Sequence, residues 1–322
     1  MKKIKTVVFL SLAFIFSFLV YSLYHMTNAG NDGRNIESPL PHFLTKNFPF
    51  ASVENNLWEP VISATNQSFD KKLKVTAASA VSYDLTTNRI LFAKNVKEKL
   101  PIASLTKIMT AIVALENSKP NQAIVVSQKA AGVGENSMGL SQGESLTLEE
   151  LIYGLILHSG NDAAEAIAEG SRFGKDTFVY LMNKKAEDLR LNDTHFTNPS
   201  GLEGDGKQYS TVYDLLVITR YALLNPVFSR IVSSPSRQIA ATDKHKAFYL
   251  FNETNLLTSY PGVKGVKTGY TDEAGLCLVT LLEYDGHRII AILLNAENRR
   301  QEMKDLLDYS LKALGLNPPP HN

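Results

Sequence analysis

Segments that read as β-strands lie toward the two ends of this chain, and helical patterns fill the stretch between them. Gly275–Glu283 and Arg288–Asn295 are apolar runs that flank Asp285-Gly286, a dipeptide typical of tight hairpin turns. Much earlier, Ala77–Tyr83 and Arg89–Ala93 predict another hairpin around a polar turn. Strands at both ends imply an antiparallel sheet formed from N- and C-terminal segments. The predicted fold class is therefore α+β, with helices flanking the sheet and an inserted helical lobe.

The helical part of this prediction rests on apolar spacing and on end signals. The apolar residues of Ser104–Glu116 cluster toward one side, as in a helix that packs on a core. Thr147-x-x-Glu150 is a capping box that predicts a helix over Leu148–His158. Three further elements are predicted: a helix over Asn161–Glu169, a strand over Gly265–Tyr270 and a closing helix over Gln301–Leu314.

The N-terminus reads as an export signal. Three lysines within the first five residues precede an apolar run from Val7 to Tyr24. A helix of this length spans roughly 27 Å, close to the thickness of a bilayer core, which favours a retained anchor. Small residues at Thr27 and Ala29 fit a cleaved signal peptide instead, so residues 1–28 are either a signal peptide or a membrane anchor. Both predict an extracytoplasmic protein, in the periplasm or on the outer face of the cytoplasmic membrane.

The remainder of the chain divides by composition. Residues 29–72 are rich in Asn, Pro, Ser and Asp and predict a tether, with apolar islands near Phe48 and Trp58 that favour local docking. Residues 73–316 carry the ordered pattern of one domain, and the Pro-rich tail over 317–322 is expected to be frayed. A net charge of +1 offers no basic field for nucleic acid. The histidines show no metal-ligand spacing, and Cys277, as the single cysteine, allows no intrachain disulfide.

Three short motifs carry groups suited to nucleophilic chemistry. They are Ser104-Leu105-Thr106-Lys107 at a predicted helix start, Ser159-Gly160-Asn161 between two predicted helices, and Lys267-Thr268-Gly269 on a predicted strand. Each motif alone is weak, because Ser68-Phe69-Asp70-Lys71 repeats the first pattern in the tether, where we interpret it as surface. All three in this order are typical of penicillin-binding proteins and related lactamases.

The first motif has a physical rationale. Residues i and i+3 of a helix lie on one face, so the Ser104 hydroxyl and the Lys107 amine can meet. A serine hydroxyl needs a base, and Lys107 can act as that base only when it is neutral. Neutralising an ordinary lysine at pH 7 costs roughly 4 to 5 kcal/mol. Burial and a second cation lower this cost, and Lys267 is the candidate second cation.

The chain resembles the low-molecular-mass penicillin-binding proteins, the serine D-alanyl-D-alanine carboxypeptidases, over about Val75–Leu316. The resemblance rests on the three motifs and on longer phrases. These phrases are Pro101-Ile102-Ala103-Ser104-Leu105-Thr106-Lys107, Gly143-Glu144-Ser145-Leu146-Thr147, Ser159-Gly160-Asn161-Asp162-Ala163-Ala164, Phe196-Thr197-Asn198-Pro199-Ser200-Gly201-Leu202 and Lys267-Thr268-Gly269-Tyr270-Thr271. The phrase at Asn198–Gly201 reads as a turn that shapes the helical lobe.

The resemblance implies an enzyme that removes the terminal D-alanine from peptidoglycan pentapeptide stems. It implies that Ser104 attacks the carbonyl between the two terminal D-alanines and that Lys107 is its base. Ser159 would relay a proton to the leaving D-alanine, and Asn161 would orient Lys107 and the peptide. The reaction uses no cofactor and no metal, and β-lactams would acylate Ser104 as covalent inhibitors.

The substrate-binding residues implied by the resemblance are Lys267, Thr268, Gly269, Tyr270 and Arg299. Lys267, Thr268 and Arg299 would bind the terminal carboxylate, and the backbone N–H groups of Ser104 and Tyr270 would form the oxyanion hole. Arg299 and the adjacent Arg300 also fit solvated charges at a helix start. We interpret Cys277 as a buried strand residue and His158 as structural, since no acidic partner for His158 is evident.

Several alternatives stay open. A D,D-endopeptidase on cross-linked peptidoglycan would share the whole site. A class A-like β-lactamase adds a glutamate phrase after the second motif, and we find none between Asn161 and Lys267. A non-catalytic wall-binding scaffold conflicts with the intact motifs. The sequence predicts no C-terminal β-rich domain of the kind many relatives carry, so we expect the N-terminal segment, if uncleaved, to hold the protein at the cytoplasmic membrane.

Overall fold

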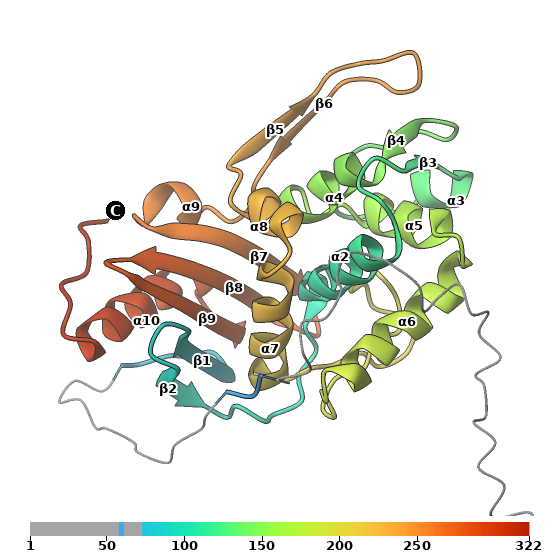
Figure 1. Cartoon of the computed structure of the whole chain (residues 1–322). Coiled ribbons are helices and arrows are strands. Elements are labelled where there is room, and N and C mark those ends of the chain that lie inside the picture. The colour runs from blue at the N-terminus through green and yellow to red at the C-terminus, as the bar shows by residue number, and fades with distance from the viewer. Residues whose placement is uncertain (1–57, 61–72, 322) are drawn as a thin grey trace, which may run out of the picture. The chain divides into compact units, whose positions relative to one another are not determined.

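The computed structural model describes residues 58–60 and 73–321 (Figure 1). The predictions for the export segment, for most of the tether and for the motif at Ser68–Lys71 lie outside the described residues. Within the described part, no single helix is long and apolar enough to cross a bilayer. The consecutive helices α7 (Val212–Leu223) and α8 (Pro226–Val232) reach that apolar length only together, and they are bent by 108°.

A five-stranded antiparallel sheet forms the centre of the fold, in the order β2-β1-β9-β8-β7. Its strands are β1 (Ser79–Asp84), β2 (Arg89–Lys94), β7 (Val263–Thr271), β8 (Gly275–Tyr284) and β9 (His287–Ala296). β1 pairs with β9, so segments from both ends of the chain meet in one sheet. The predicted α+β class and the antiparallel sheet are confirmed, and each of these strands lies within two residues of its expected bounds.

Both faces of the sheet are covered, which explains why Leu276–Leu282 of β8 and Ile289–Leu294 of β9 are apolar apart from Thr280. Helix α10 (Arg299–Ala313) packs on one face, where Leu278 and Leu293 meet Met303 of the helix. On the opposite face, Val279 and Ile292 belong to the core shared with the helical lobe. Side chains of a strand alternate between its faces, so strands covered on both sides need apolar residues at every position.

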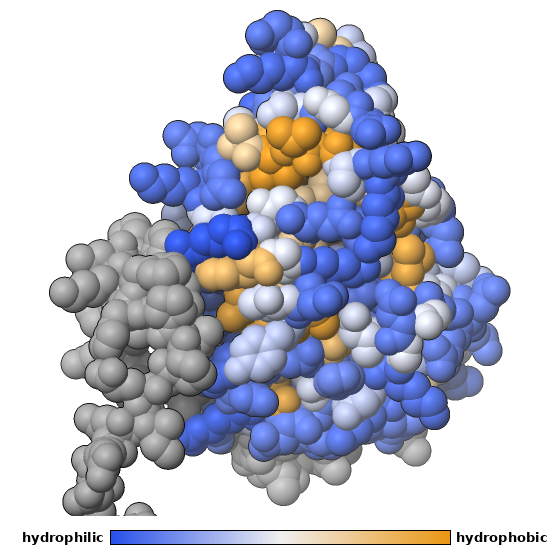
Figure 2. All heavy atoms as spheres, turned by 90° about the vertical axis from the view of Figure 1, so that its right-hand side faces the viewer, coloured by the Kyte–Doolittle hydropathy of each residue, from blue (hydrophilic) through white to orange (hydrophobic). Residues whose placement is uncertain are grey.

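The inserted lobe surrounds helix α2 (Thr106–Asn117), which is buried from Thr106 to Leu115. The sequence predicts a helix with one apolar side, but the buried residues of α2 also include Thr106, Lys107 and Thr110, so neighbours cover the helix on all sides. Helix α2 packs against α4 (Leu148–Leu157), α5 (Asn161–Gly170), α6 (Gly174–Asp188) and α7, while α3 (Gln128–Ala131) packs on α5, and α8 packs on α4 and α7. Thr147 and Glu150 form the predicted capping box at the start of α4. The outward side of the lobe is mainly hydrophilic, with separate hydrophobic patches (Figure 2).

Two small hairpins and one short helix complete the fold. The first hairpin pairs β3 (Ala123–Val125) with β4 (Ser145–Thr147), and the second pairs β5 (Ser236–Ile239) with β6 (Phe248–Phe251). The β5–β6 hairpin projects beside the lobe at the top of Figure 1. Helix α9 (Leu256–Ser259) then leads into β7.

The described residues of both flanking segments contact the domain. The Trp58 ring packs edge-on against Tyr83 with centroids 5.3 Å apart, and the Arg220 guanidinium carbon lies 4.6 Å from its centroid. This agrees with the expected local docking of the tether. The C-terminal tail differs from its expected fraying, because His321 stacks on Tyr260 at 4.5 Å. The Tyr260 ring and the Asp308 carboxylate, 3.0 Å from His321 Nε2, are contacts that composition alone does not reveal.

Candidate active site

Ser104 lies in a tight turn that precedes helix α2. The sequence predicts that Ser104 begins the α-helix, whereas the structure places it in a 3-10 turn, η2 (Ala103–Leu105), with α2 starting at Thr106. Ala103 has a φ of 47°, which turns the chain sharply before the serine. Gly201 backs this turn so closely that a Cβ there would lie 2.0 Å from the Ala103 carbonyl oxygen. Only glycine fits, and its φ of +89° is also one that glycine favours.

The Lys107 amine lies at the centre of the site. Its Nζ is 2.8 Å from Ser104 Oγ, 2.8 Å from Asn161 Oδ1 and 2.7 Å from the Ser200 carbonyl oxygen. The side chain is fully buried. As an ammonium, Lys107 donates to all three oxygens. As a neutral amine, it keeps two donors for Asn161 and Ser200 and turns a lone pair toward the Ser104 hydroxyl, which then donates to it.

The electrostatics of the site favour the neutral form of Lys107. Burial lowers the pKa of Lys107 well below its usual range, and the charge of Lys267 lowers it further. A nearby serine and a lysine with a lowered pKa are the components of a general-base pair. The arrangement therefore allows proton removal from Ser104 near neutral pH.

A structured loop over residues 198–202 supplies one of the lysine's acceptors. Asn198 Oδ1 accepts hydrogen bonds from the backbone N–H groups of Ser200 and Gly201, and Nδ2 donates to the Leu202 carbonyl oxygen. Thr110 Oγ1 on α2 donates to the Pro199 carbonyl oxygen at 2.6 Å. These bonds point the Ser200 carbonyl at Lys107. The sequence predicts only that this phrase shapes the lobe.

The second motif fills the short connection between α4 and α5. Ser159 is 2% exposed and has a φ of 55°, a backbone conformation that non-glycine residues rarely adopt. Asn161, the first residue of α5, bonds Lys107 and also donates from Nδ2 to the Gly134 carbonyl oxygen at 3.2 Å. Ser159 and Asn161 both line one cleft together with Ser104.

Asp162 is a supporting residue whose role the sequence does not indicate. Its buried carboxylate accepts hydrogen bonds from the backbone N–H groups of Met138, Gly139 and Leu140 and from the Ser137 hydroxyl. These bonds fix the loop over 137–140 at the start of α5. Glu135 and Asn136, which precede this loop, line the cleft in front of Ser104.

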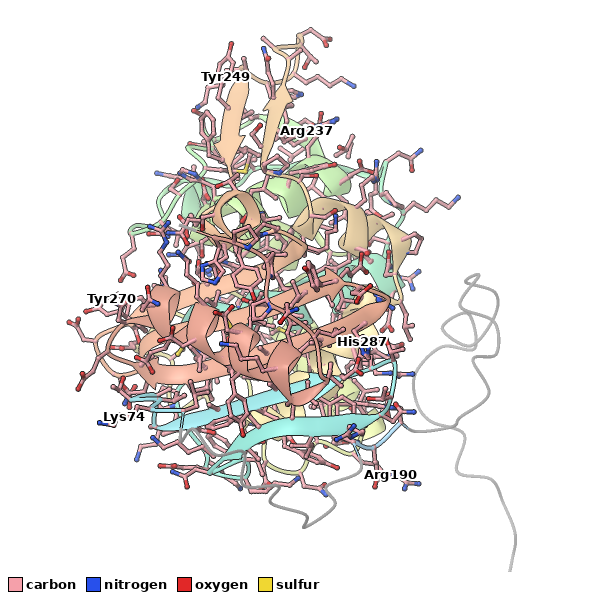
Figure 3. All side chains as sticks on the ribbon, turned by 90° about the vertical axis from the view of Figure 1, so that its left-hand side faces the viewer. Lys74, Arg190, Arg237, Tyr249, Tyr270 and His287 are labelled. Carbon is pink, nitrogen blue, oxygen red and sulfur yellow. The ribbon has the colours of Figure 1, made fainter. Side chains whose placement is uncertain are left out.

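The third motif lies on the edge strand β7. Lys267 is 1% exposed, and its Nζ donates to the Thr268 carbonyl oxygen at 3.0 Å. Burial lowers the pKa of Lys267 to about 8, so most of it remains a cation at neutral pH. A Cβ on Gly269 would lie 3.3 Å from the Ser104 backbone nitrogen, so the strand runs tightly against the turn of the serine. Tyr270 follows and projects outward, 57% exposed (Figure 3).

Arg299, the first residue of α10, reaches the same region. Its Nη1 donates to the Gly269 carbonyl oxygen at 2.7 Å, and burial lowers its pKa. Arg299 lines the cleft in front of Ser104, whereas the exposed Arg300 is not among the residues that line it.

A small, open cleft of about 130 Å³ joins these groups. Seven of the nine predicted site residues line it, and the other two, Lys107 and Lys267, are buried behind it. The lining residues are Ser104, Glu135, Asn136, Ser159, Asn161, Gly201, Leu202, Thr268, Gly269, Tyr270, Thr271 and Arg299.

Glu253 is a charged neighbour of this cleft that the motifs do not include. It follows strand β6, and its Oε2 accepts from Thr268 Oγ1 at 3.3 Å while its Oε1 accepts from Asn136 Nδ2 at 3.2 Å. Its charge opposes the effect of burial and raises the pKa of both Lys107 and Lys267. Glu253 belongs to no recognisable phrase, so only the fold could reveal its position.

Cys277 does not belong to the reactive groups. It is fully buried on β8, and burial raises the pKa of its thiol to about 11. Over residues 58–60 and 73–321, no group of three or more His, Cys, Asp or Glu side chains could hold a metal ion.

The sequence profile of peptidase family S11, described as D-alanyl-D-alanine carboxypeptidase, matches residues 64–298. The D-alanyl-D-alanine carboxypeptidase DacF of Bacillus subtilis is 34% identical over 250 residues, which cover 75% of this chain and 64% of DacF. The D-alanyl-D-alanine carboxypeptidase DacB2 of Mycobacterium tuberculosis is 36% identical over 212 residues, which cover 66% of this chain and 72% of DacB2. This chain therefore spans less than two thirds of the length of DacF.

Solved structures agree in fold. The DD-transpeptidase of Streptomyces K15 superposes with a TM-score of 0.70 at 29% identity, covering 75% of this chain and 99% of that enzyme. A D-alanyl-D-alanine carboxypeptidase from Mycobacterium tuberculosis superposes with a TM-score of 0.69 at 31% identity, covering 82% of this chain and 98% of that one.

Proposed function

The chain belongs to the D-alanyl-D-alanine carboxypeptidases of peptidase family S11, and from this premise we propose that it removes the terminal D-alanine from peptidoglycan pentapeptide stems. The observation that carries the proposal is the contact of 2.8 Å between Lys107 Nζ and Ser104 Oγ, with Lys107 buried near a second buried lysine. This pairing supplies a nucleophile, a base and a cation for a carboxylate within one cleft.

Acylation follows from this arrangement. Ser104 Oγ attacks the carbonyl carbon between the two terminal D-alanines as its proton passes to Lys107 Nζ. The developing oxyanion is bound by the backbone N–H groups of Ser104 and Tyr270, which belong to the closely packed turn and strand. The C–N bond then breaks, and the leaving nitrogen takes the proton from Lys107 through the Ser159 hydroxyl. The products are free D-alanine and an ester on Ser104.

The terminal carboxylate of the substrate determines which peptide bond lies at Ser104. Lys267 and Arg299 supply positive charge, and Thr268 supplies a hydroxyl donor, at the end of the cleft formed by β7 and α10. Charge-assisted hydrogen bonds to a carboxylate are stronger than neutral ones. A substrate without a free terminal carboxylate would lose these contacts. Asn161 orients Lys107 and the peptide.

Deacylation uses the same base. A water molecule loses a proton to Lys107 as it attacks the ester, and the Ser104 oxygen leaves and regains that proton. The enzyme returns to its starting state with a shortened stem. A β-lactam presents the same carbonyl and carboxylate pattern, so it would acylate Ser104 in the same way.

The test is release of D-alanine from a soluble pentapeptide that ends in D-Ala-D-Ala. We expect the wild-type protein to release it and Ser104→Ala to release none. Cleavage of cross-linked dimers without action on the monomeric peptide would identify an endopeptidase. Rapid turnover of a β-lactam would identify a lactamase, and the absence of any covalent penicillin label would identify a non-catalytic scaffold.

Aminolysis is a second candidate, because the structure of the Streptomyces K15 DD-transpeptidase is covered almost completely by this chain. The same ester on Ser104 can pass to an amine instead of water. Adding a glycine or D-amino acid acceptor to the pentapeptide assay separates the two, since an enzyme that transfers would form the new peptide bond in preference to the hydrolysed product.

We further propose that the enzyme works outside the cytoplasmic membrane. The support is the lysine-rich start followed by the apolar run from Val7 to Tyr24. Mass spectrometry of the mature N-terminus tests it. An intact N-terminus in the membrane fraction supports an anchor, and a new N-terminus near residue 29 supports a cleaved signal.

A further inference from the structure

The β5–β6 hairpin exposes two aromatic side chains next to each other on one face. Tyr249 is 64% exposed and Phe251 is 67% exposed, whereas Phe248 and Leu250 between and beside them are 3% and 2% exposed. This alternation places the apolar pair of β6 in the core and the aromatic pair in solvent. Single exposed apolar residues are ordinary, but two large aromatics on one strand face form a surface.

Polar, uncharged residues complete this face. In the strand register, Gln238 lies opposite Tyr249 and Ser236 lies opposite Phe251, and both are exposed. Arg237 lies between them on the other face, where its guanidinium carbon is 4.9 Å from the centroid of the Tyr153 ring. Tyr249 and Arg237 point to opposite sides of the hairpin in Figure 3. We call the set Ser236, Gln238, Tyr249 and Phe251 the hairpin platform.

The hairpin platform is close along the chain to a residue that contacts the cleft. Glu253 comes two residues after Phe251, and its carboxylate bonds Thr268 and Asn136, both of which line the cleft. At about 3.3 Å per residue, Phe251 and Tyr249 lie roughly 7 and 13 Å along the chain from Glu253. Tyr249 projects to the same side of the molecule as Tyr270, which lines the cleft (Figure 3).

We propose that the hairpin platform binds sugar rings of the glycan strand that carries the stem peptide. This inference rests on the proposed function. A stem of five residues spans at most about 17 Å, a length that exceeds the roughly 7 to 13 Å of chain between Glu253 and the two aromatic residues of the platform. The C–H face of a sugar ring packs on an aromatic ring, and the Gln238 amide and Ser236 hydroxyl can bond sugar hydroxyl and N-acetyl groups.

The composition of the platform argues against other occupants. A protein partner typically covers about 800 Å² through some 20 to 30 residues on each side, and this platform has four. A membrane surface is recognised by clustered lysines and arginines, and the platform itself contains neither. Aromatic rings flanked by neutral hydrogen-bonding groups suit an uncharged, hydroxyl-rich polymer.

The first test is binding of purified glycan strands from which all peptides have been removed, measured with the full protein. The double variant Tyr249→Ala/Phe251→Ala is expected to bind about tenfold more weakly than wild type, a change of about 1.4 kcal/mol, because both aromatic rings that pack on the sugar are removed. Tyr180→Ala on α6, where the side chain is 56% exposed, is the matched control and is expected to bind as wild type does. Equal binding by all three proteins overturns the proposal.

The second test compares two substrates of one enzyme. The double variant is expected to keep the wild-type kcat/KM on soluble pentapeptide and to lose about tenfold on pentapeptides attached to glycan strands. Equal loss on both substrates overturns the proposal. A double variant that binds glycan strands as wild type does, but loses self-association or binding to lipid vesicles, also overturns it. If the wild-type protein releases D-alanine from neither substrate, the proposed function is wrong. Binding to peptide-free glycan strands still tests the hairpin platform in that case. Tyr249→Gln/Phe251→Gln replaces the alanine pair if that protein does not fold.

Discussion

Glu253→Gln tests whether the charges around the two lysines set the pH range of the enzyme. Glutamine keeps an oxygen for Thr268 and removes only the negative charge. Besides Glu253, the charged groups that act on the lysine pair are Glu135, Asp162 and Arg299. None of these three changes in the variant.

The sign follows from the roles of the lysines. Activity rises as pH increases through the pKa of Lys107, because loss of its proton creates the base. Activity falls as pH increases through the pKa of Lys267, about 8, because the carboxylate then loses its cation. Glu253 raises both pKa values, so its removal lowers both. Both limbs of the pH profile of kcat/KM therefore move to lower pH.

The exposure of Glu253 limits the size of this shift. Exposed ion pairs contribute about 0.2 to 1 kcal/mol, which corresponds to roughly half a pKa unit. On a limb of unit slope, activity rises about threefold at acid pH and falls about threefold at alkaline pH. Release of D-alanine from pentapeptide between pH 5 and 10 measures this, with the exposed Glu187→Gln as control. Limbs that stay in place, or that move to higher pH, would refute the reasoning.

Three further predictions concern Lys267, Gly201 and Cys277. Lys267→Gln removes both a carboxylate contact and the second cation near Lys107. The value of kcat/KM should therefore fall about a hundredfold, and the acid limb of its pH profile should move to higher pH. An acid limb that does not move would count against the two-lysine pairing. Gly201→Ala forces a Cβ to within 2.0 Å of the Ala103 carbonyl oxygen. Thermal unfolding should therefore show a free energy of unfolding lower by about 1 to 3 kcal/mol, and penicillin labelling of the variant should be slower. A variant with wild-type stability and wild-type labelling would contradict the packing. Cys277 should resist alkylation in the native protein at pH 7, since its thiol is buried with a raised pKa; rapid labelling would show that β8 is open there.

The strands and the main helices of the domain follow from local patterns. The hairpin dipeptide Asp285-Gly286 lies between β8 and β9, and the capping box at Thr147 starts α4. The contact of Ser104 with Lys107 also follows from spacing, since a separation of three residues brings them together across the junction of the 3-10 turn and α2, as it would within an α-helix. These features depend on residues that are near each other in the sequence.

The remaining features depend on long-range contacts. Ser104 leaves the α-helix because Gly201 and Gly269, from distant segments, press against its turn. Glu253 enters the site because its backbone N–H donates to the Leu157 carbonyl oxygen at the end of α4, where its carboxylate meets Thr268. Asn136 enters because the buried Asp162 fixes the residues that follow it. No local pattern encodes such neighbours.

The most direct test of the central claim is the position of the covalent bond. The protein is incubated with a penicillin, digested, and mapped by mass spectrometry. The account predicts one adduct, on the peptide that contains Ser104, and none in Ser104→Ala. An adduct on another residue, a Ser104→Ala protein that still takes the label, or a wild-type protein that takes none would contradict it.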